Sequence, residues 1–420
     1  MPDLFIKPGM LTGEIIVPPS KSMAHRAIIC SAMAGDLSLA GSFDKETSND
    51  IIATIKAIKS LLSGENELFC NESGSTLRFL IPIAAALGKA VTFTGAGRLP
   101  NRPLAEYRDI LSDKGVCLEF PPKGTLPLKI KGRLKAGEFK VPGDVSSQYV
   151  TGLLLALPLL NGDSKVFITS ELESAAYVDM TIRVMQHFGV RVERLVNGYF
   201  VNGNQKYLKT PFKVEGDYSQ GAFWMVANYL GSHIKLSGLE SSSAQGDKQI
   251  IPIIKEYEEL KASPDRSMRD NVKQYWSAII GKKQEMDILE IDASQIPDLI
   301  PILAVAGANS NVITKIVNAN RLRYKESDRL KTTAQLISNI GGNVVETSDG
   351  LIIYGGTPLT GGDVDSAGDH RIAMAAAIAA ITTQNGIRLK NYKCVDKSYP
   401  DFFDDFKKAG GCCYELDVGK

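Results

Sequence analysis

One structural plan recurs six times along this chain, at intervals of roughly 70 residues. Each copy has a short extended stretch, a turn of Gly, Ser or Asp, and a helix rich in Ala and Leu. The predicted helix starts are 53, 71, 73, 77 and 74 residues apart, at Ser20, Ser73, Asp144, Asp217, Ser294 and Gly368. These helices are apolar nearly all round, which is typical of buried helices. We therefore expect all six to form the interior of the protein.

A more amphipathic helix is predicted after each buried one, for example over residues 49–62 and 326–340. Several end in Gly followed by a β-rich stretch, a pattern that indicates a helix stop leading into a strand. Each unit therefore contains two helices and several strands, with its first helix inside and its sheet outside. Linker signals at Pro18-Pro19 and Thr210-Pro211 divide the six units three and three.

Composition limits the classes of function. The chain has 420 residues, 44% hydrophobic and 23% charged, values typical of a soluble globular protein with two or three domains. Its formal net charge is only +1, whereas a nucleic-acid-binding protein usually has a clearly basic balance or block. Any anion must therefore be bound by cations that are concentrated in one site.

Several other classes of protein are disfavoured. The longest apolar run, Ile372–Ile381, has ten residues, whereas a membrane-spanning helix needs about 20. The first residues lack a signal-peptide core, and the six cysteines form no CxxC pair. The sequence also contains neither the P-loop pattern nor the G-x-S-x-G nucleophile elbow. We expect a cytoplasmic protein without a bound metal.

Positive charges occur at several predicted helix starts, where the helix dipole disfavours them. Lys21, Ser22 and Arg26 follow the first start, and Arg371 follows the last. A lysine in solvent beside a capping serine is the simpler explanation for Lys21 alone. Recurrence at three or four helix starts instead favours one site for several anions, because exposed N–H groups at a helix start attract anions.

Other polar residues lie in similar settings. Lys325 and Arg329 are like charges four residues apart, with Glu326 between them; a solvated charged face is the alternative there. Asp298 lies between apolar runs, where it could serve as a general base or as a first-turn partner of the helix dipole. Lys397 lies between a predicted strand and a helix, a position suited to a phosphate ligand.

Nine motifs, in order, resemble those of the 3-phosphoshikimate 1-carboxyvinyltransferase (5-enolpyruvylshikimate-3-phosphate synthase) family. They are PPSKSMAHR, ESGSTLRFL, NRP, GDVSSQY, YVDMT, IPDL, YKESDRL, GDHRIAM and DKSYPDFF. The match as a whole runs from about residue 7 to residue 406. Each motif alone is weak, whereas the ordered series is specific and covers nearly the whole chain.

The resemblance implies the two-domain α/β enolpyruvyl transferase fold, an inside-out α/β barrel. Six βαβαββ units would place their helices inside and their sheets outside, and the first strand would belong with the C-terminal half. One domain would comprise residues 20–215, and a discontinuous one residues 1–19 and 216–420. The helix starts of both would meet in the cleft between them.

The resemblance also assigns ligand contacts. Those to shikimate-3-phosphate would come from Lys21, Ser22, Arg26, Ser146, Ser147, Gln148, Ser174, Asp298 and Lys325. Those to phosphoenolpyruvate would come from Lys21, Gly74, Arg102, Gln148, Arg329, Arg371 and Lys397. Seven cations among these residues would face two substrates that each carry a phosphate and a carboxylate.

The implied reaction adds the 5-hydroxyl of shikimate-3-phosphate to C2 of phosphoenolpyruvate while C3 is protonated, and then eliminates phosphate. Asp298 would deprotonate the hydroxyl, and Glu326 with Lys21 would handle proton transfer at C3. No metal or organic cofactor is implied. We expect a transferase of the shikimate pathway to chorismate and aromatic amino acids, active as a monomer and binding neither nucleic acid nor membrane.

Three positions depart from the family pattern. Glu72 stands where Asn is usual, Arg321 replaces an Asn near the shikimate phosphate in some members, and Ala176 replaces a frequent Pro. Glu72 leaves open both its own contact to phosphoenolpyruvate and the sensitivity to glyphosate, which inhibits the family at the phosphoenolpyruvate site.

Two other functions remain as alternatives. UDP-N-acetylglucosamine enolpyruvyl transferase, the sister enzyme, typically carries a Cys at the position of Gly97. A non-catalytic anion-binding repeat protein is the second alternative, although Asp298 and Glu326 would only weaken anion binding.

Overall fold

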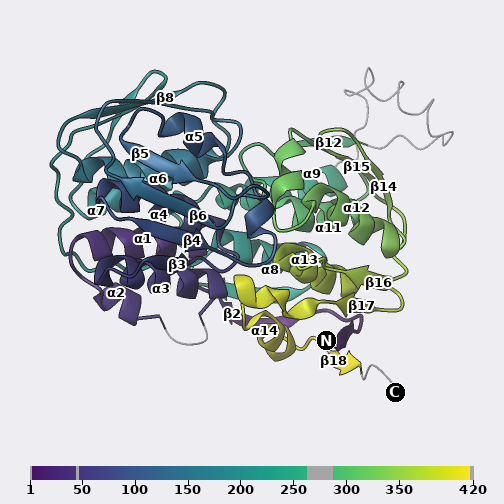
Figure 1. Cartoon of the computed structure of the whole chain (residues 1–420). Helices are drawn as coiled ribbons and strands as arrows, with labels where there is room; N and C mark the ends of the chain where they lie inside the picture. The colour runs from purple at the N-terminus through teal and green to yellow at the C-terminus, as the bar shows by residue number, and fades with distance from the viewer. Residues whose placement is uncertain (1, 44–46, 263–286, 417–420) are drawn as a thin grey trace.

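The computed structural model describes residues 2–43, 47–262 and 287–416. Figure 1 shows two halves side by side, one coloured purple to teal and the other mostly green to yellow. The first strand of the chain lies in the second half, beside the last strand. The mixed helix and strand content agrees with the expected two-domain α/β class.

Four sheets share one strand order and one pattern of directions. Their orders are β3-β4-β6-β5, β7-β8-β10-β9, β12-β13-β15-β14 and β16-β17-β1-β18. In each sheet the first pair is parallel and the other two pairs are antiparallel. A parallel pair requires a crossover connection, and in every unit a buried helix provides it.

The strands of these sheets are short. Their bounds are β1 Asp3–Ile6, β3 Glu67–Phe69, β4 Val91–Thr94, β5 Val116–Glu119, β6 Leu128–Gly132, β7 Glu138–Val141, β8 Ser164–Ile168, β9 Glu193–Leu195, β10 Gly198–Val201, β12 Ile288–Asp292, β13 Ile313–Val317, β14 Asn343–Glu346, β15 Leu351–Tyr354, β16 Gly362–Asp365, β17 Ile387–Lys390 and β18 Cys413–Leu416.

The N-terminal strand β1 completes the last unit of the chain. It pairs with β17 and β18 and so occupies the place that β6, β10 and β15 have in the other sheets. The next strand, β2 (Thr12–Ile16), runs parallel to β11 (His233–Ser237) in a sheet of two strands. The first three-unit half is therefore an insertion between strands of the second half.

Only four of the six expected units have the full set of strands among the described residues. The unit of β11 has its two-stranded sheet, and the stretch after the first long helix contains the short helix α2 (Ser38–Gly41). These two units adjoin the segments that cross between the halves.

The predicted buried helices are present, and most begin close to the expected residues. They are α1 Lys21–Met33, α4 Gly74–Ala86, α6 Ser147–Ala156, α8 Tyr218–Tyr229, α11 Ile300–Ala308 and α13 His370–Ala380. The expected start of α11 at Ser294 is wrong by about one and a half turns, because residues 294–299 form turns instead. The expected start of α6 at Asp144 is early by less than one turn.

The second helix of each unit is amphipathic, with one apolar face on the core. These helices are α3 Asn49–Ser63, α5 Glu106–Ile110, α7 Ala175–His187, α9 Ile250–Ala262, α12 Arg329–Asn339 and α14 Phe402–Lys408. Helix α5 is short, and the chain after it takes left-handed backbone conformations at Asp113 and Gly115, with φ of 57° and 79°. The described residues also contain five short 3-10 helices: η1 Leu99–Asn101, η2 Leu157–Leu159, η3 Gly246–Gln249, η4 Asn320–Tyr324 and η5 Tyr392–Lys397.

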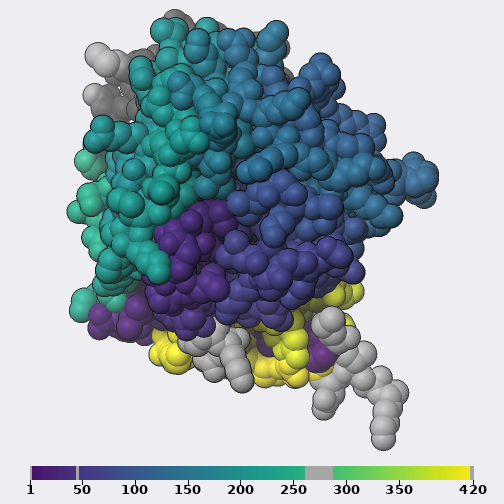
Figure 2. All heavy atoms as spheres, turned by 60° about the vertical axis from the view of Figure 1, so that its left-hand side comes forward, coloured from purple at the N-terminus to yellow at the C-terminus, as the bar shows by residue number. Residues whose placement is uncertain are grey.

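The buried side chains form two separate hydrophobic clusters. One contains residues between Met23 and Tyr207, and the other joins Leu4–Ile15 to residues from Tyr218 onward. In Figure 2 part of the purple N-terminal stretch lies between teal and blue residues, and α1 packs directly on α7. The two clusters suit domains of 20–215 and of 1–19 with 216–420, but these boundaries stay a prediction.

The two crossover segments lie against each other. Pro19 forms an antiparallel bridge with Gly216, and the Ser20 amide donates to the Glu215 carbonyl at 2.7 Å. The Lys21 amide, in turn, donates to Asp217 Oδ2 at 3.0 Å. These contacts fix the start of α1 relative to the start of α8, and so hold the edges of the two halves together.

Candidate active site

A pocket of about 580 Å³ lies between the two halves, and most of the predicted site residues line it. The first half contributes Lys21, Ser22, Arg26, Gly74, Arg102, Ser146, Ser147, Gln148 and Ser174, and the second contributes Asp298, Lys325, Glu326, Arg329 and Arg371. Lys397 is the one predicted site residue that does not line it.

The starts of four helices border this pocket, and each start is capped by a short polar side chain. Ser20, Ser73, Ser146 and Asp369 accept backbone N–H groups at the starts of α1, α4, α6 and α13. The described first turns of these four helices contain no acidic residue. Their positive dipole ends therefore add to the field of the nearby cations.

Asp298 lies in the turn before α11 and is held by three cations. Arg329 Nη1 is 2.8 Å from its Oδ1, Arg371 Nη2 is 2.9 Å from its Oδ2, and Lys325 Nζ is 3.8 Å from Oδ1. Burial raises the pKa of the carboxyl, but these charges outweigh it and hold the pKa well below its usual value. Burial lowers the pKa of Lys325 to about 8. Asp298 is therefore ionised in the substrate-free pocket.

Glu326 contacts cations from both halves. Its Oε2 is 2.7 Å from Arg329 Nη2, and its Oε1 is 3.4 Å from Arg102 Nη1. Burial raises the pKa of Glu326, but Arg102 and Arg329 hold it well below its usual range. The carboxylate is thus suited to accept a proton once an anionic ligand has drawn these cations away.

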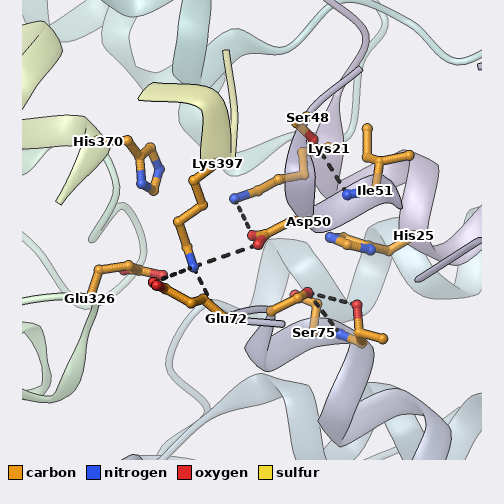
Figure 3. A network of polar contacts seen from close by, with 12 residues as sticks. Lys21, His25, Ser48, Asp50, Ile51, Glu72, Ser75, Glu326, His370 and Lys397 are labelled. Atoms are coloured by element: carbon orange, nitrogen blue, oxygen red, sulfur yellow. Dashed lines mark hydrogen bonds and ion pairs between the residues drawn. The ribbon is translucent and has the colours of Figure 1, made fainter. Parts of the chain in front are cut away.

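A buried network joins Lys21 to Lys397 through Asp50, as Figure 3 shows. Asp50 Oδ2 is 2.9 Å from Lys21 Nζ, and its Oδ1 is 3.5 Å from Lys397 Nζ. Lys397 also donates to the Glu72 carbonyl at 2.9 Å and lies 3.5 Å from Glu72 Oε2. Lys397, from the second half, therefore contacts Asp50 and Glu72 of the first half but does not line the pocket.

Gly74 lets two guanidinium groups approach the start of α4. A Cβ at Gly74 would lie 2.9 Å from Nη1 of both Arg78 and Arg102. Arg78 Nη1 also donates to Gln148 Oε1 at 2.7 Å, and Gln148 Nε2 donates to Ser75 at 2.9 Å. The predicted residues Gly74, Arg102 and Gln148 therefore form one group, oriented by Arg78.

Arg26 is engaged with the protein through all three of its nitrogens. Its Nε donates to Thr181 Oγ1 at 2.7 Å, its Nη1 to the Ser22 carbonyl at 2.5 Å and its Nη2 to the Tyr177 carbonyl at 3.0 Å. Burial lowers its pKa to about 10, so it remains charged at neutral pH. These bonds fix the orientation of the guanidinium in the pocket wall.

Several functional residues were missed by the sequence reasoning. Asp50 pairs with two lysines, and Asp369 caps α13 while its Oδ2 lies 2.9 Å from Arg329 Nε. His370 lines the pocket, and among the described residues neither ring nitrogen has a hydrogen-bond partner. A signal existed for Asp369, because it is an acid at the start of the helix in which the sequence analysis singles out Arg371.

Two further findings concern metals and membranes. Within residues 2–43, 47–262 and 287–416, no three His, Cys, Asp or Glu side chains are grouped as a metal site would need. In the same ranges, no helix combines the length and the apolar character that a membrane span requires.

Comparison with known proteins identifies the family. The sequence model of EPSP synthase (3-phosphoshikimate 1-carboxyvinyltransferase) matches residues 37–406. A 3-phosphoshikimate 1-carboxyvinyltransferase from Clostridium novyi is 46% identical, with both chains covered in full. One from Clostridium acetobutylicum is 43% identical over 99% of each chain. The chain belongs to the EPSP synthase family. This confirms the resemblance of the motif series and disfavours the sister enzyme.

Solved structures show the same fold at much lower identity. An EPSP synthase from Acinetobacter baumannii matches with a TM-score of 0.76 at 23% identity, covering 99% of this chain and all of that one. The enolpyruvyl transferase NikO from Streptomyces tendae matches with a TM-score of 0.69 at 15% identity, over 99% of each chain. The two-domain fold of the EPSP synthase family therefore extends over the whole chain.

Proposed function

We propose that this pocket transfers the carboxyvinyl group of phosphoenolpyruvate to the 5-hydroxyl of shikimate-3-phosphate and releases phosphate. The observation that carries the proposal is the position of Asp298, an ionised carboxylate in direct contact with Arg329 and Arg371. A base among anion-binding cations is what proton abstraction beside two anionic substrates requires. Membership of the EPSP synthase family supports the same reaction.

The substrate contacts in this proposal are those that the family resemblance implies, and all of these residues except Lys397 line the pocket. We assign phosphoenolpyruvate to the cluster of Arg102, Arg329, Arg371 and Lys397 with Lys21, Gly74 and Gln148. We assign shikimate-3-phosphate to Lys21, Ser22, Arg26, Ser146, Ser147, Gln148, Ser174, Asp298 and Lys325. The two sets share Lys21 and Gln148, so the substrates would bind side by side with their reacting atoms near Asp298.

The proposed reaction has two steps. First, Asp298 takes the hydroxyl proton, the oxygen attacks C2 of phosphoenolpyruvate, and C3 receives a proton. Next, C3 loses a proton while the C2–O bond to phosphate breaks. Lys21 and Glu326, which both line the pocket, suit the transfers at C3, because an ammonium donates a proton and an ionised carboxylate accepts one. Phosphoenolpyruvate brings its own leaving group, so the route requires no cofactor.

The cations around the leaving group would balance its developing charge. In the substrate-free protein Arg329 is paired with Asp298, Glu326 and Asp369, and Lys397 with Asp50 and Glu72. Preorganised cations in a site from which water is excluded stabilise transition-state charge strongly. A departing phosphate would exchange places with some of these carboxylates.

Gly97 favours shikimate-3-phosphate over UDP-N-acetylglucosamine as the acceptor substrate. Its φ is +57°, and a Cβ there would lie 2.4 Å from the Glu72 carboxyl group. A cysteine of the sister enzyme's type would therefore clash unless Glu72 moved. A purely anion-binding role is disfavoured by Asp298 and Glu326, which neutralise two of the cations that an anion would need.

We also propose a cytoplasmic, monomeric enzyme of the shikimate pathway. The six free cysteines suit a reducing compartment.

Isotope labelling tests the reaction. Phosphoenolpyruvate labelled with heavy oxygen at the bridge between C2 and phosphorus is incubated with shikimate-3-phosphate and the enzyme. We expect the label in the released phosphate, because the C–O bond breaks. Label that stays with the three-carbon product would mean cleavage of the P–O bond, as in a phosphatase, and would contradict the proposal.

A further inference from the structure

Arg371 has outer nitrogens that face the pocket and an inner nitrogen that is left unpaired. Its Nη1 and Nη2 donate to the carbonyl and to Oδ2 of Asp298 at 3.2 and 2.9 Å, and Nη2 also donates to Ser219 Oγ at 3.0 Å. Its Nε is buried and has no hydrogen-bond partner within the described part of the chain. Native proteins leave few buried donors unpaired, so this Nε requires an explanation.

Arg329, the other arginine on Asp298, shows how such a side chain can be held. Its Nε lies 2.9 Å from Asp369 Oδ2. Its Nη nitrogens extend into the pocket, to Asp298 and Glu326. A carboxylate on Nε fixes the plane of the guanidinium and leaves the outer nitrogens for a ligand. Arg371 has comparable outer contacts, and it is the acid on its Nε that the substrate-free protein does not supply.

Asp247, in η3, is an acid that can fill this place. The residue is 4% exposed, and its Oδ2 accepts from Tyr177 Oη at 2.8 Å. Its Oδ1 is buried and, among the described residues, unpaired. Burial lowers the pKa of Arg371, whereas Asp298 and Asp247 raise it, so the charge of Asp247 acts on this guanidinium. An unpaired acceptor therefore lies near an unpaired donor.

The charge of Asp247 depends on groups from four other elements. Burial and the neighbouring acids Asp298, before α11, and Asp217, at the start of α8, raise the pKa of its carboxyl to about 7. Arg371 of α13 and the Tyr177 hydroxyl of α7 act in the opposite direction. Near neutral pH the carboxyl is therefore divided between its neutral and charged forms, and only the charged form makes an ion pair with an arginine.

We propose that Asp247, in its charged form, is a positioning residue for Arg371. When phosphoenolpyruvate binds the Nη nitrogens and displaces Asp298, Asp247 Oδ1 pairs with the Nε of Arg371. The arrangement then matches that of Arg329 with Asp369. The inference rests on the proposed function and adds to it a residue that orients a substrate-binding cation without touching the substrate.

The pH dependence of KM tests this role. Steady-state kinetics with both substrates are measured for wild type, Asp247→Asn, Asp247→Glu and the control Asp363→Asn. Asp363 is exposed on β16 and does not line the pocket. We expect KM for phosphoenolpyruvate in Asp247→Asn to exceed that of wild type about 10-fold at about pH 8, as loss of a charge-assisted hydrogen bond implies. At about pH 6 the ratio should approach 1, because the wild-type acid is then neutral as well.

The other variants separate positioning from a structural role. KM for shikimate-3-phosphate should change less than about threefold in Asp247→Asn, and Asp247→Glu should recover part of the phosphoenolpyruvate affinity. Tyr177→Phe retains the ring and removes the hydrogen bond that lowers the pKa of Asp247. In that variant the pH at which KM for phosphoenolpyruvate changes should therefore move upward. Circular dichroism checks that each variant is folded.

Three results would overturn the inference. A ratio of KM values that is the same at both pH values would make Asp247 a merely structural contact. Tighter binding of phosphoenolpyruvate in Asp247→Asn would make Asp247 a competitor for Arg371. An unmoved pH dependence in Tyr177→Phe would mean that another group titrates. Inactivity of the wild type with shikimate-3-phosphate would instead contradict the proposed function itself.

Discussion

Arg371 contacts Asp298 twice, through Nη2 to Oδ2 at 2.9 Å and through Nη1 to the backbone carbonyl at 3.2 Å. Arg329 holds the other carboxylate oxygen at 2.8 Å. The carboxylate is therefore a weak base while both guanidinium groups remain on it. Binding of phosphoenolpyruvate to these arginines should release Asp298 and raise its pKa, so that the base becomes effective only when both substrates are present.

Asp298→Asn should separate chemistry from binding. We expect kcat to fall about 10²- to 10⁴-fold, the range for loss of a general base. Affinity for phosphoenolpyruvate should be equal or higher, because the amide no longer competes for Arg329 and Arg371. Phosphate release gives kcat, and calorimetry gives the two affinities. Loss of binding in a folded variant would make Asp298 a ligand contact first and a base second.

Binding of shikimate-3-phosphate should weaken above about pH 8. The folded pKa of Lys325 is about 8 because burial disfavours its charge, against the opposing effect of Asp298. Arg329 and Arg321 also lower it, while Glu326 raises it. As pH rises through this value the cation is lost, so KM for shikimate-3-phosphate should rise severalfold by about pH 9. Lys325→Met should have a higher KM throughout and lack this inflection.

The same pKa predicts a stability effect with a defined sign. The folded pKa of Lys325 is about 8 and its usual value is 10.5, so between them the unfolded state binds more protons. The free energy of unfolding contributed by this group should therefore rise with pH across that window. Urea titrations of wild type and Lys325→Met measure it as their difference. A difference that falls with rising pH would contradict the assignment.

Lys21→Met should abolish turnover and also destabilise the fold. The helix dipole alone predicts a small gain when a cation leaves the start of α1. The ion pair to buried Asp50 at 2.9 Å reverses that expectation, and we expect a loss of roughly 1–3 kcal/mol. In urea titrations the double variant Lys21→Met/Asp50→Asn should regain the lost stability. It should remain inactive in the turnover assay. A single variant as stable as wild type would mean that Lys397 alone satisfies Asp50.

Gly74→Ala should weaken glyphosate more than phosphoenolpyruvate. The new methyl would lie 2.9 Å from Nη1 of Arg78 and Arg102, so these flexible ends must shift. Glyphosate is longer than phosphoenolpyruvate, so it has less room to shift when these arginine ends move. One extra methyl in a filled site changes affinity by about 10-fold or more. Inhibition is compared at matched phosphoenolpyruvate saturation. Equal inhibition of both proteins would mean that Gly74 does not border the ligand.

Sequence periodicity predicted the buried helices, because their apolar residues and capping side chains are local signals. It placed the α11 start wrongly at Ser294, since small polar residues suit turns and helix caps equally. The cross-cleft pairs could not be predicted: Lys397 meets Glu72 325 positions away, and Arg102 meets Glu326 224 positions away. Cations could be noted singly in the sequence, whereas the carboxylates that neutralise them depend on how the halves pack.

Phosphate release by the wild-type protein tests the central claim most directly. The enzyme is supplied with phosphoenolpyruvate and, in parallel, with shikimate-3-phosphate, with UDP-N-acetylglucosamine or with no acceptor. We predict rapid release of phosphate with shikimate-3-phosphate alone, and formation of its carboxyvinyl ether in equal amount. Release with UDP-N-acetylglucosamine but not with shikimate-3-phosphate, or release that needs no acceptor, would contradict the account.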